Sequence, residues 1–202
     1  MLKSMLQRLR DARAEELEGE GAGEAGFTLI ELMVVLLIIA ILLAIAIPTF
    51  LGVTKGANDR GAQSNLTNAS TEAAAVYQNN GQAYPLGTTT TNYSASAPEF
   101  TWVDGSASTG PSTSQNQISV DAFAVAGEAN TAYQGVALAV MSKTGTCWFA
   151  VNLQQTPGTG NASKQSAAGT LYAQSSTAAN CWAGYALGHA VTGINYSSAN
   201  AI

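Results

Sequence analysis

Residues 32–47 read LMVVLLIIAILLAIAI, and none of these sixteen side chains is polar. Extended back to Phe27, the apolar run covers twenty-one residues and is interrupted only by Thr28 and Glu31. A helix needs about 20 residues to cross the hydrocarbon of a bilayer, because each residue adds about 1.5 Å. The alternative is a buried helix in a soluble core, but a domain of this size does not easily cover a helix that is apolar on every face. We therefore expect residues 27–47 to span a membrane.

The composition of the 202 residues argues against several classes of protein. Eight basic and 13 acidic residues give a net charge of −5, so nucleic acid is not indicated as a partner. One histidine, His189, and two cysteines are too few for a zinc cluster or an iron–sulfur site, and we expect neither a metal nor a cofactor. No nucleophile, base and orienting group stand in a recognisable pattern, so no catalytic residue is assigned and an enzyme is not expected.

The segment in front of the apolar run, residues 1–26, is polar and ends in small residues. It holds four of the eight basic residues and six of the 13 acidic ones. Glycine and alanine fill residues 19–26 apart from Glu20 and Glu24. A secretory signal peptide has its small-residue cleavage site after the apolar core, whereas here the small residues come before it. This order does not suit ordinary signal peptidase.

The junction itself, residues 26–35, reads GFTLIELMVV and closely resembles the processing and assembly motif of type IV prepilins. The resemblance rests on a glycine, then a phenylalanine, a glutamate at the fifth position after the cut, and an unbroken apolar run. In that family a dedicated prepilin peptidase cuts after the glycine, on the cytoplasmic side, and the new N-terminal residue is methylated. The resemblance implies cleavage between Gly26 and Phe27, methylation of Phe27, and removal of residues 1–26 as a cytoplasmic leader. The leader is longer, and more acidic near the cut, than many in the family.

Glu31 places a carboxylate in this apolar segment, which costs about 2.5–3.5 kcal/mol at mid-span, so such residues are usually paired. The expected partner is the amine that cleavage would create at Phe27. Residues four apart are neighbours on a helix, so Phe27 and Glu31 can pair within one subunit. The resemblance implies that the pair forms between subunits, where it selects their axial stagger during assembly. The alternative is a glutamate at the cytoplasmic interface with no partner.

The helix is expected to continue beyond the membrane, so that it covers residues 27–80 and is about 80 Å long. Pro48 removes one backbone hydrogen bond and Gly52 weakens the next turn, which predicts a kink or a locally melted stretch. In assembled pili of the family a comparable stretch loses helicity. A weakly apolar stripe suited to packing on a sheet follows at helical spacing: Ala62, Leu66, Ala69, Ala73 and Val76.

Residues 81–202 are expected to form an extracellular β-rich head domain. Glycine- and hydroxyl-rich loops are expected over residues 82–116 and 154–169. Strands are expected at residues 117–126, 134–141 and 146–153, with shorter ones at 99–103, 170–173 and 184–191, and with a turn at Ser142–Gly145. The predicted fold class is α+β: a long N-terminal α-helix, membrane-spanning in its first half, packed on a C-terminal antiparallel β-sheet head, as in type IV pilins.

The two cysteines, Cys147 and Cys181, both fall in the part expected outside the cytoplasm. An even pair in an oxidising compartment favours a disulfide, which would close a loop of about 34 residues. Such a bond also resembles the C-terminal disulfide loop of many pilins. Two free buried thiols are the alternative, and metal binding by two cysteines and a distant histidine is a further one.

Together these features predict a structural subunit of a type IV pilus. The chain is expected to be held in the cytoplasmic membrane as a single-pass prepilin with its head outside, and then to polymerise into an extracellular homo-oligomeric helical filament. Its expected partners are the prepilin peptidase, the pilus assembly machinery, and the cytoplasmic membrane before assembly. A minor pilin or a type II secretion pseudopilin shares the motif and stays an alternative, as does a signal-anchored surface binding protein that never polymerises.

Overall fold

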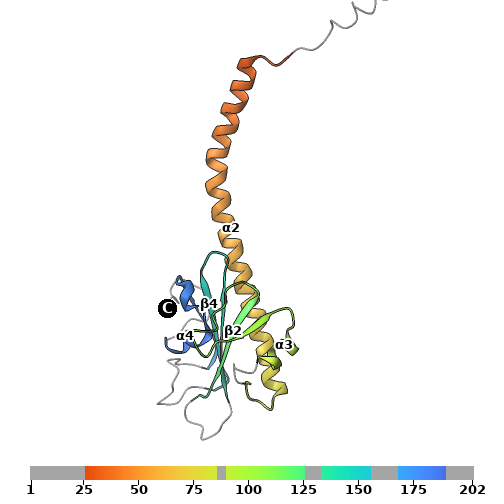
Figure 1. Cartoon of the computed structure of the whole chain (residues 1–202), viewed down its shortest axis with the longest axis vertical. Coiled ribbons are helices and arrows are strands. Elements are labelled where there is room, and N and C mark those ends of the chain that lie inside the picture. The colour runs from red at the N-terminus through yellow and green to blue at the C-terminus, as the bar shows by residue number, and fades with distance from the viewer. Residues whose placement is uncertain (1–25, 86–89, 126–132, 156–167, 190–202) are drawn as a thin grey trace, which may run out of the picture. The chain divides into compact units, whose positions relative to one another are not determined.

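A computed structural model describes residues 26–85, 90–125, 133–155 and 168–189. The chain divides into two compact units, residues 1–50 and residues 51–202. The first unit holds the beginning of the long helix α2 (Leu29–Asn79), and the second holds the rest of α2 and the head (Figure 1). The expected helix covered residues 27–80, so the observed one begins two residues later and ends one residue earlier.

In the first unit, α2 is apolar on all sides and covered by nothing within that unit. An 18-residue window of this helix is long and apolar enough to cross a membrane, and none of the window is buried. The helix continues without interruption through Pro48, so residues 44–56 contain no melted stretch in this structure. The predicted kink at Pro48 and Gly52 stays a prediction.

In the second unit, α2 packs through one stripe of small apolar residues. All five residues of the predicted stripe are buried: Ala62, Leu66, Ala69, Ala73 and Val76. These positions recur every three or four residues, so they lie on one face of the helix and can all be buried together. After Asn79 the chain turns through Gly81, whose φ of 68° is a left-handed conformation that glycine adopts without strain.

The head contains one five-stranded sheet in the order β1-β2-β3-β4-β5. Its strands are β1 (Thr101–Asp104), β2 (Gln117–Phe123), β3 (Gly135–Met141), β4 (Cys147–Leu153) and β5 (Gly169–Ser175). The last four strands form the expected antiparallel meander, and Ser142–Gly145 forms the turn between β3 and β4, with Gly145 N–H donating to Ser142 O at 3.0 Å.

The expectation of a purely antiparallel sheet is wrong at one edge, because β1 pairs with β2 in parallel. The connecting segment, residues 105–116, carries the chain back to the end from which β1 started. A parallel pair needs such a crossover, whereas a tight turn can only produce an antiparallel pair. The segment is held near the sheet by Ser119, whose Oγ donates to Gly110 O at 2.7 Å.

Both faces of the sheet are covered, and neighbouring residues of each strand alternate between them. On β4, Trp148 and Ala150 belong to the core beneath α2, whereas Cys147, Phe149 and Val151 belong to a second core on the other face. The second core is closed by the C-terminal part of the head. This double burial explains why β3, with the sequence GVALAVM, is apolar at nearly every position.

Two short helices differ from the sequence expectations. Within the expected loop of residues 82–116, α3 (Thr91–Ser96) forms because Tyr93 and Ala97, four apart, are both buried. Where a strand was expected at residues 184–191, α4 (Ala183–Leu187) forms instead. Ala183 and Ala186, three apart, bury one side of α4 against the sheet, and alanine favours a helix. Residues 190–191 lie outside the described part of the chain.

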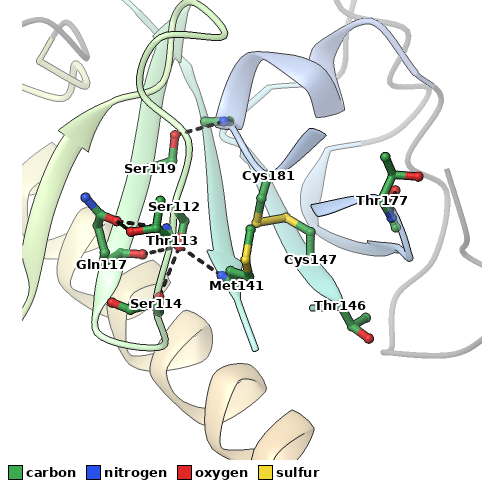
Figure 2. Close-up of a disulfide and its surroundings, with 12 residues drawn as sticks. Ser112, Thr113, Ser114, Gln117, Ser119, Met141, Thr146, Cys147, Thr177 and Cys181 are labelled. Atoms are coloured by element: carbon green, nitrogen blue, oxygen red, sulfur yellow. Dashed lines mark hydrogen bonds between the residues drawn. A yellow bond between two sulfur atoms is a disulfide. The ribbon is translucent and has the colours of Figure 1, made fainter. Parts of the chain in front are cut away.

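The expected disulfide is present, so the two thiols are not free and cannot hold a metal. Cys147 at the start of β4 is bonded to Cys181, both side chains are 0% exposed, and their Cα atoms are 5.3 Å apart (Figure 2). The same corner is held by backbone contacts, since Ser112 N–H donates to Cys181 O at 2.6 Å. Ala183 N–H also donates to Ser119 Oγ at 3.1 Å. The disulfide thus fixes the segment that covers the second face of the sheet.

Candidate functional site at the start of the long helix

The first turn of α2 is closed by a reciprocal pair of side chains, Thr28 and Glu31. Thr28 is the capping residue, because its carbonyl accepts the first helical hydrogen bond from Leu32 N–H at 3.3 Å. Its Oγ1 accepts a hydrogen bond from Glu31 N–H at 3.3 Å. In return, Glu31 Oε2 accepts bonds from Thr28 N–H at 2.8 Å and from Thr28 Oγ1 at 2.7 Å. This arrangement is a capping box, which satisfies backbone donors that would otherwise have no partner at a helix start.

Sequence reasoning missed this local role of Glu31. The spacing Thr-x-x-Glu before an apolar run is a known sequence pattern for a capping box and was readable from residues 28–31. Only one carboxylate oxygen is used, because both bonds to Thr28 end on Oε2. The other oxygen, Oε1, accepts no hydrogen bond from the described residues. The capping box therefore leaves Glu31 able to accept a bond from a second group.

Gly26 and Phe27 lie immediately before the capping box and are both exposed. Phe27 is 86% exposed, so its ring contributes almost nothing to any core of the described chain. A Cβ atom added at Gly26 would meet nothing within 4 Å, and its backbone needs no left-handed conformation. Nothing within the described chain therefore requires glycine at position 26.

The helix that follows presents large aliphatic side chains to its surroundings. Every large apolar residue from Leu29 to Val53 is exposed, with fractions between 45% and 75%. Near the end of this region, Thr49 Oγ1 donates to Ile45 O at 2.6 Å, beside the position where Pro48 lacks an N–H. Gly52 has open space around it, since an added Cβ would meet nothing within 4 Å. This surface has the chemistry to contact lipid chains or other apolar helices.

The described residues hold no group of three or more His, Cys, Asp or Glu side chains able to bind a metal. His189 stacks on Tyr185 with ring centroids 4.2 Å apart, and its Nδ1 lies 2.8 Å from Tyr185 O. His189 thus contacts a residue of α4, and it is more than 150 residues after the capping box in the sequence.

Comparison with protein families finds one match over the site: residues 22–47 match the prokaryotic N-terminal methylation motif. The chain carries a prepilin motif. The match begins four residues before Gly26 and ends at Ile47, so it covers the capping box and most of the apolar half of α2, which runs from Leu29 to Val53. It supports a type IV pilin-like prepilin, a class of structural protein. Comparisons with curated proteins and with solved structures find no match.

The prepilin motif and the structure together bring several predicted site residues into one short segment. Gly26, Phe27 and Glu31 all lie at the start of α2, within the matched range. Pro48 lies one residue beyond it, and the disulfide belongs to the head. The motif, the apolar helix and the α+β head form the pilin-like arrangement expected from the sequence.

Proposed function

We propose that this chain is a prepilin that is cleaved after Gly26, methylated at Phe27 and polymerised as a structural subunit of a type IV pilus. The observation that carries the proposal is the methylation motif at residues 22–47 on a helix whose apolar half is entirely exposed. An apolar surface of this length needs a bilayer or other helices around it in water. Residues 27–47 would meet lipid before assembly and the filament core afterwards.

The proposed cleavage leaves the capping box intact. Both Thr28 and Glu31 lie after the cut, and the Thr28 N–H belongs to the peptide bond that joins it to Phe27. Cleavage would add a positively charged amine at Phe27 without removing any of the bonds to Oε2. Since Oε1 remains available, Glu31 can receive the amine of a neighbouring subunit and still cap its own helix. We propose this pair as the contact that sets the stagger between subunits.

The proposed domain organisation follows from the same cut. Residues 1–26 would be the removed leader, residues 27–80 the long helix, and residues 81–202 the head on the outside of the membrane. The buried disulfide supports an oxidising location for the head. Pro48 and Gly52 are proposed to give α2 a weak point at the membrane exit.

The deciding experiment is N-terminal peptide mass spectrometry on protein sheared from the cell surface. We expect a peptide that begins at Phe27 and is one methyl group heavier than the unmodified sequence. A peptide that still carries residues before Phe27 would contradict processing and favour a signal-anchored surface protein. A processed chain that is scarce in purified filaments would indicate a minor pilin or a pseudopilin instead of a bulk subunit.

The role of Glu31 can be separated from its capping function with two matched variants. Glu31→Gln keeps an N3 side chain that suits a capping box but removes the charge. Thr28→Val removes the Oγ1 bonds but keeps the carboxylate. We expect Glu31→Gln, like Glu31→Ala, to be inserted and cleaved but to yield no filaments, whereas Thr28→Val assembles. Normal filament yield from Glu31→Gln would remove the pairing argument.

A further inference from the structure

The basic side chains of the described chain are gathered at one place. Among the described residues, only Lys55, Arg60 and Lys143 are lysine or arginine, and all three are exposed. Lys55 and Arg60 are on α2, one on each side of Asp59 in the sequence. Lys143 is more than eighty residues further along the chain, in the turn between β3 and β4, which lies beside α2 in Figure 1.

The fold brings Lys143 to the other two through hydrogen bonds to Asp59. Asp59 Oδ1 accepts bonds from Ser142 Oγ and from Thr144 Oγ1, each at 2.5 Å. Ser142 and Thr144 are the immediate neighbours of Lys143, so the turn is fixed to α2 between Lys55 and Arg60. Thr144 N–H also donates to Ser142 Oγ at 3.0 Å, which orders the turn itself. We call Lys55, Arg60 and Lys143 the cationic collar.

No ion pair neutralises the collar within the described chain. The nearest carboxylate, Asp59, is occupied by two hydroxyl donors, so the local charge is three positive against one negative. Of the other described acidic residues of the head, Glu72 is some three turns further along α2, and Asp104 and Asp121 are within β1 and β2. Glu99 precedes β1, at the end of the sheet where the β3–β4 turn also lies, two strands away from β3. Asp121 pairs in register with Ala137, four residues before the end of β3, whereas Lys143 is beyond that end. The positive charge of the described residues is therefore concentrated at this end of the head.

This end of the head begins directly after exposed apolar residues of α2. Leu51 is 55% exposed and Val53 is 69% exposed, and Lys55 follows Val53 by two residues. Leu51 and Lys55 are four apart and so share one face of the helix. Lysine and arginine stems pack along apolar surface while their charged ends reach the polar interface, and each basic residue near an anionic membrane adds attraction. An apolar surface followed at once by unpaired cations matches the boundary between hydrocarbon and headgroups.

We propose that the cationic collar binds the headgroups of anionic phospholipids at the outer face of the membrane, and so holds the head against the bilayer before assembly. The proposal rests on the membrane-held form of the proposed function, but it does not depend on cleavage. Contact with acidic residues of a second copy is the competing use of the same charges. Lipid is favoured because the collar directly continues an apolar surface. The described acidic residues of the head, by contrast, are spread over several elements and form no cluster that would match the three cations of the collar.

The test uses the full chain in a non-ionic detergent, titrated with phosphatidylglycerol or phosphatidylcholine and examined by native mass spectrometry. We expect the chain to retain phosphatidylglycerol in preference to phosphatidylcholine. Lys143→Gln should weaken phosphatidylglycerol retention about fivefold, although Lys143 is far from the apolar helix in sequence. The triple variant Lys55→Gln, Arg60→Gln, Lys143→Gln should weaken it more than tenfold. Adding Glu72→Lys to the triple variant returns two of the three lost positive charges some three turns along α2 from the collar, and should not restore retention.

Each outcome decides a different point. Equal phosphatidylglycerol retention by the natural chain and the triple variant would overturn the proposal. Unchanged lipid retention together with a loss of filaments in the triple variant would assign the collar to contacts between copies, which also overturns it. If the chain retained neither lipid, the membrane-held form itself would fail, and this would be visible without any collar variant. Cleavage after Gly26, measured separately, is unaffected by these results.

Discussion

The two halves of the continuous helix α2 differ in what surrounds their apolar side chains: the apolar half is exposed, whereas the packed half buries one stripe against the sheet. From Leu29 to Val53 the large apolar side chains are all exposed, and most are leucine, isoleucine or valine. From Ala62 to Tyr77 the buried residues form a narrow stripe in which alanine is the commonest type. Small residues allow a helix to approach a sheet closely, whereas large aliphatic ones on every face provide surface for many neighbours at once. The difference shows that the first half needs a surrounding that the described residues do not supply.

Removing the disulfide should have the largest effect, and only in the head. The bond closes a loop of sequence separation 34, which corresponds to about 4 kcal/mol in the chain-entropy model. We expect the double variant Cys147→Ala, Cys181→Ala to lose about this much stability in the denaturant unfolding of the full chain, followed by tryptophan fluorescence. Membrane insertion of residues 27–47 should be unchanged. An unfolding midpoint equal to that of the natural chain would mean that the hydrogen bonds around Ser112 and Ser119 hold the segment by themselves.

A matched pair of leucine substitutions tests the two halves of α2 directly. Leu66 is 0% exposed beneath the sheet, so Leu66→Ala should destabilise the head by about 3 kcal/mol through lost burial and the cavity left behind. Leu42 is 61% exposed, so Leu42→Ala should leave the unfolding of the head unchanged. Both are measured by denaturant unfolding in detergent. Equal losses from the two variants would show that the apolar half is not independent of the head.

The sequence was sufficient to predict α2 and the candidate site because both depend on local patterns. The apolar run, the glycine–phenylalanine–glutamate spacing and the stripe from Ala62 to Val76 are each visible within a few turns of helix. The last four strands also followed from short alternating or apolar segments bounded by turn residues, such as Ser142–Gly145. In these places local preference and tertiary structure agree.

The remaining elements depend on contacts between distant residues. The parallel pairing of β1 is set by a connection that Ser119 holds in place, and no short pattern encodes it. The α4 helix forms where alanines 183 and 186 meet the second face of the sheet, next to a cysteine fixed by β4. The collar likewise exists only because Asp59 binds the turn around Lys143. The capping box is different, since its pattern was local and readable.

A third prediction concerns the boundary between the halves. Gly52 and Gly56 are helical, and an added Cβ at either would meet nothing within 4 Å. Each alanine replacement should favour the helix by about 1 kcal/mol, or about 2 kcal/mol together. Hydrogen exchange of the backbone amides in residues 50–58 should therefore slow in the double variant Gly52→Ala, Gly56→Ala.

Gly61→Ala is the control for this boundary, because it makes the same glycine-to-alanine substitution within the packed half of α2. There the added Cβ would contact Gln115 at 3.6 Å. This variant should leave exchange in residues 50–58 unaltered. If assembly requires α2 to lose helicity near Pro48, the double variant should also form fewer filaments while the control forms normal numbers. Faster or unchanged exchange in the double variant would show that these glycines do not weaken the helix.

The smallest expected effect comes from a carboxylate of the head, Asp121 on β2. Burial, with a smaller contribution from the negative charge of Asp104, raises the pKa of Asp121 to about 6. An unfolded aspartate has a pKa of about 3.9, so the folded head holds this proton more tightly than the unfolded chain does. The contribution of Asp121 to the stability of the head should therefore be greatest below about pH 4 and fall as the pH rises to about 6, by on the order of 1 kcal/mol after solvent screening.

Asp121→Asn keeps the size of the side chain but cannot ionise, so it should remove this pH dependence and leave the head more stable than the natural chain at pH 7. The measurement is a series of urea unfolding curves between pH 4 and pH 7. Glu99→Gln, a change at an exposed carboxylate, serves as the control and should preserve the decline. The apolar half of α2 contains no such group after Glu31, so the pH dependence would be a property of the head. A decline of the same size in Asp121→Asn would place its origin in another titrating residue.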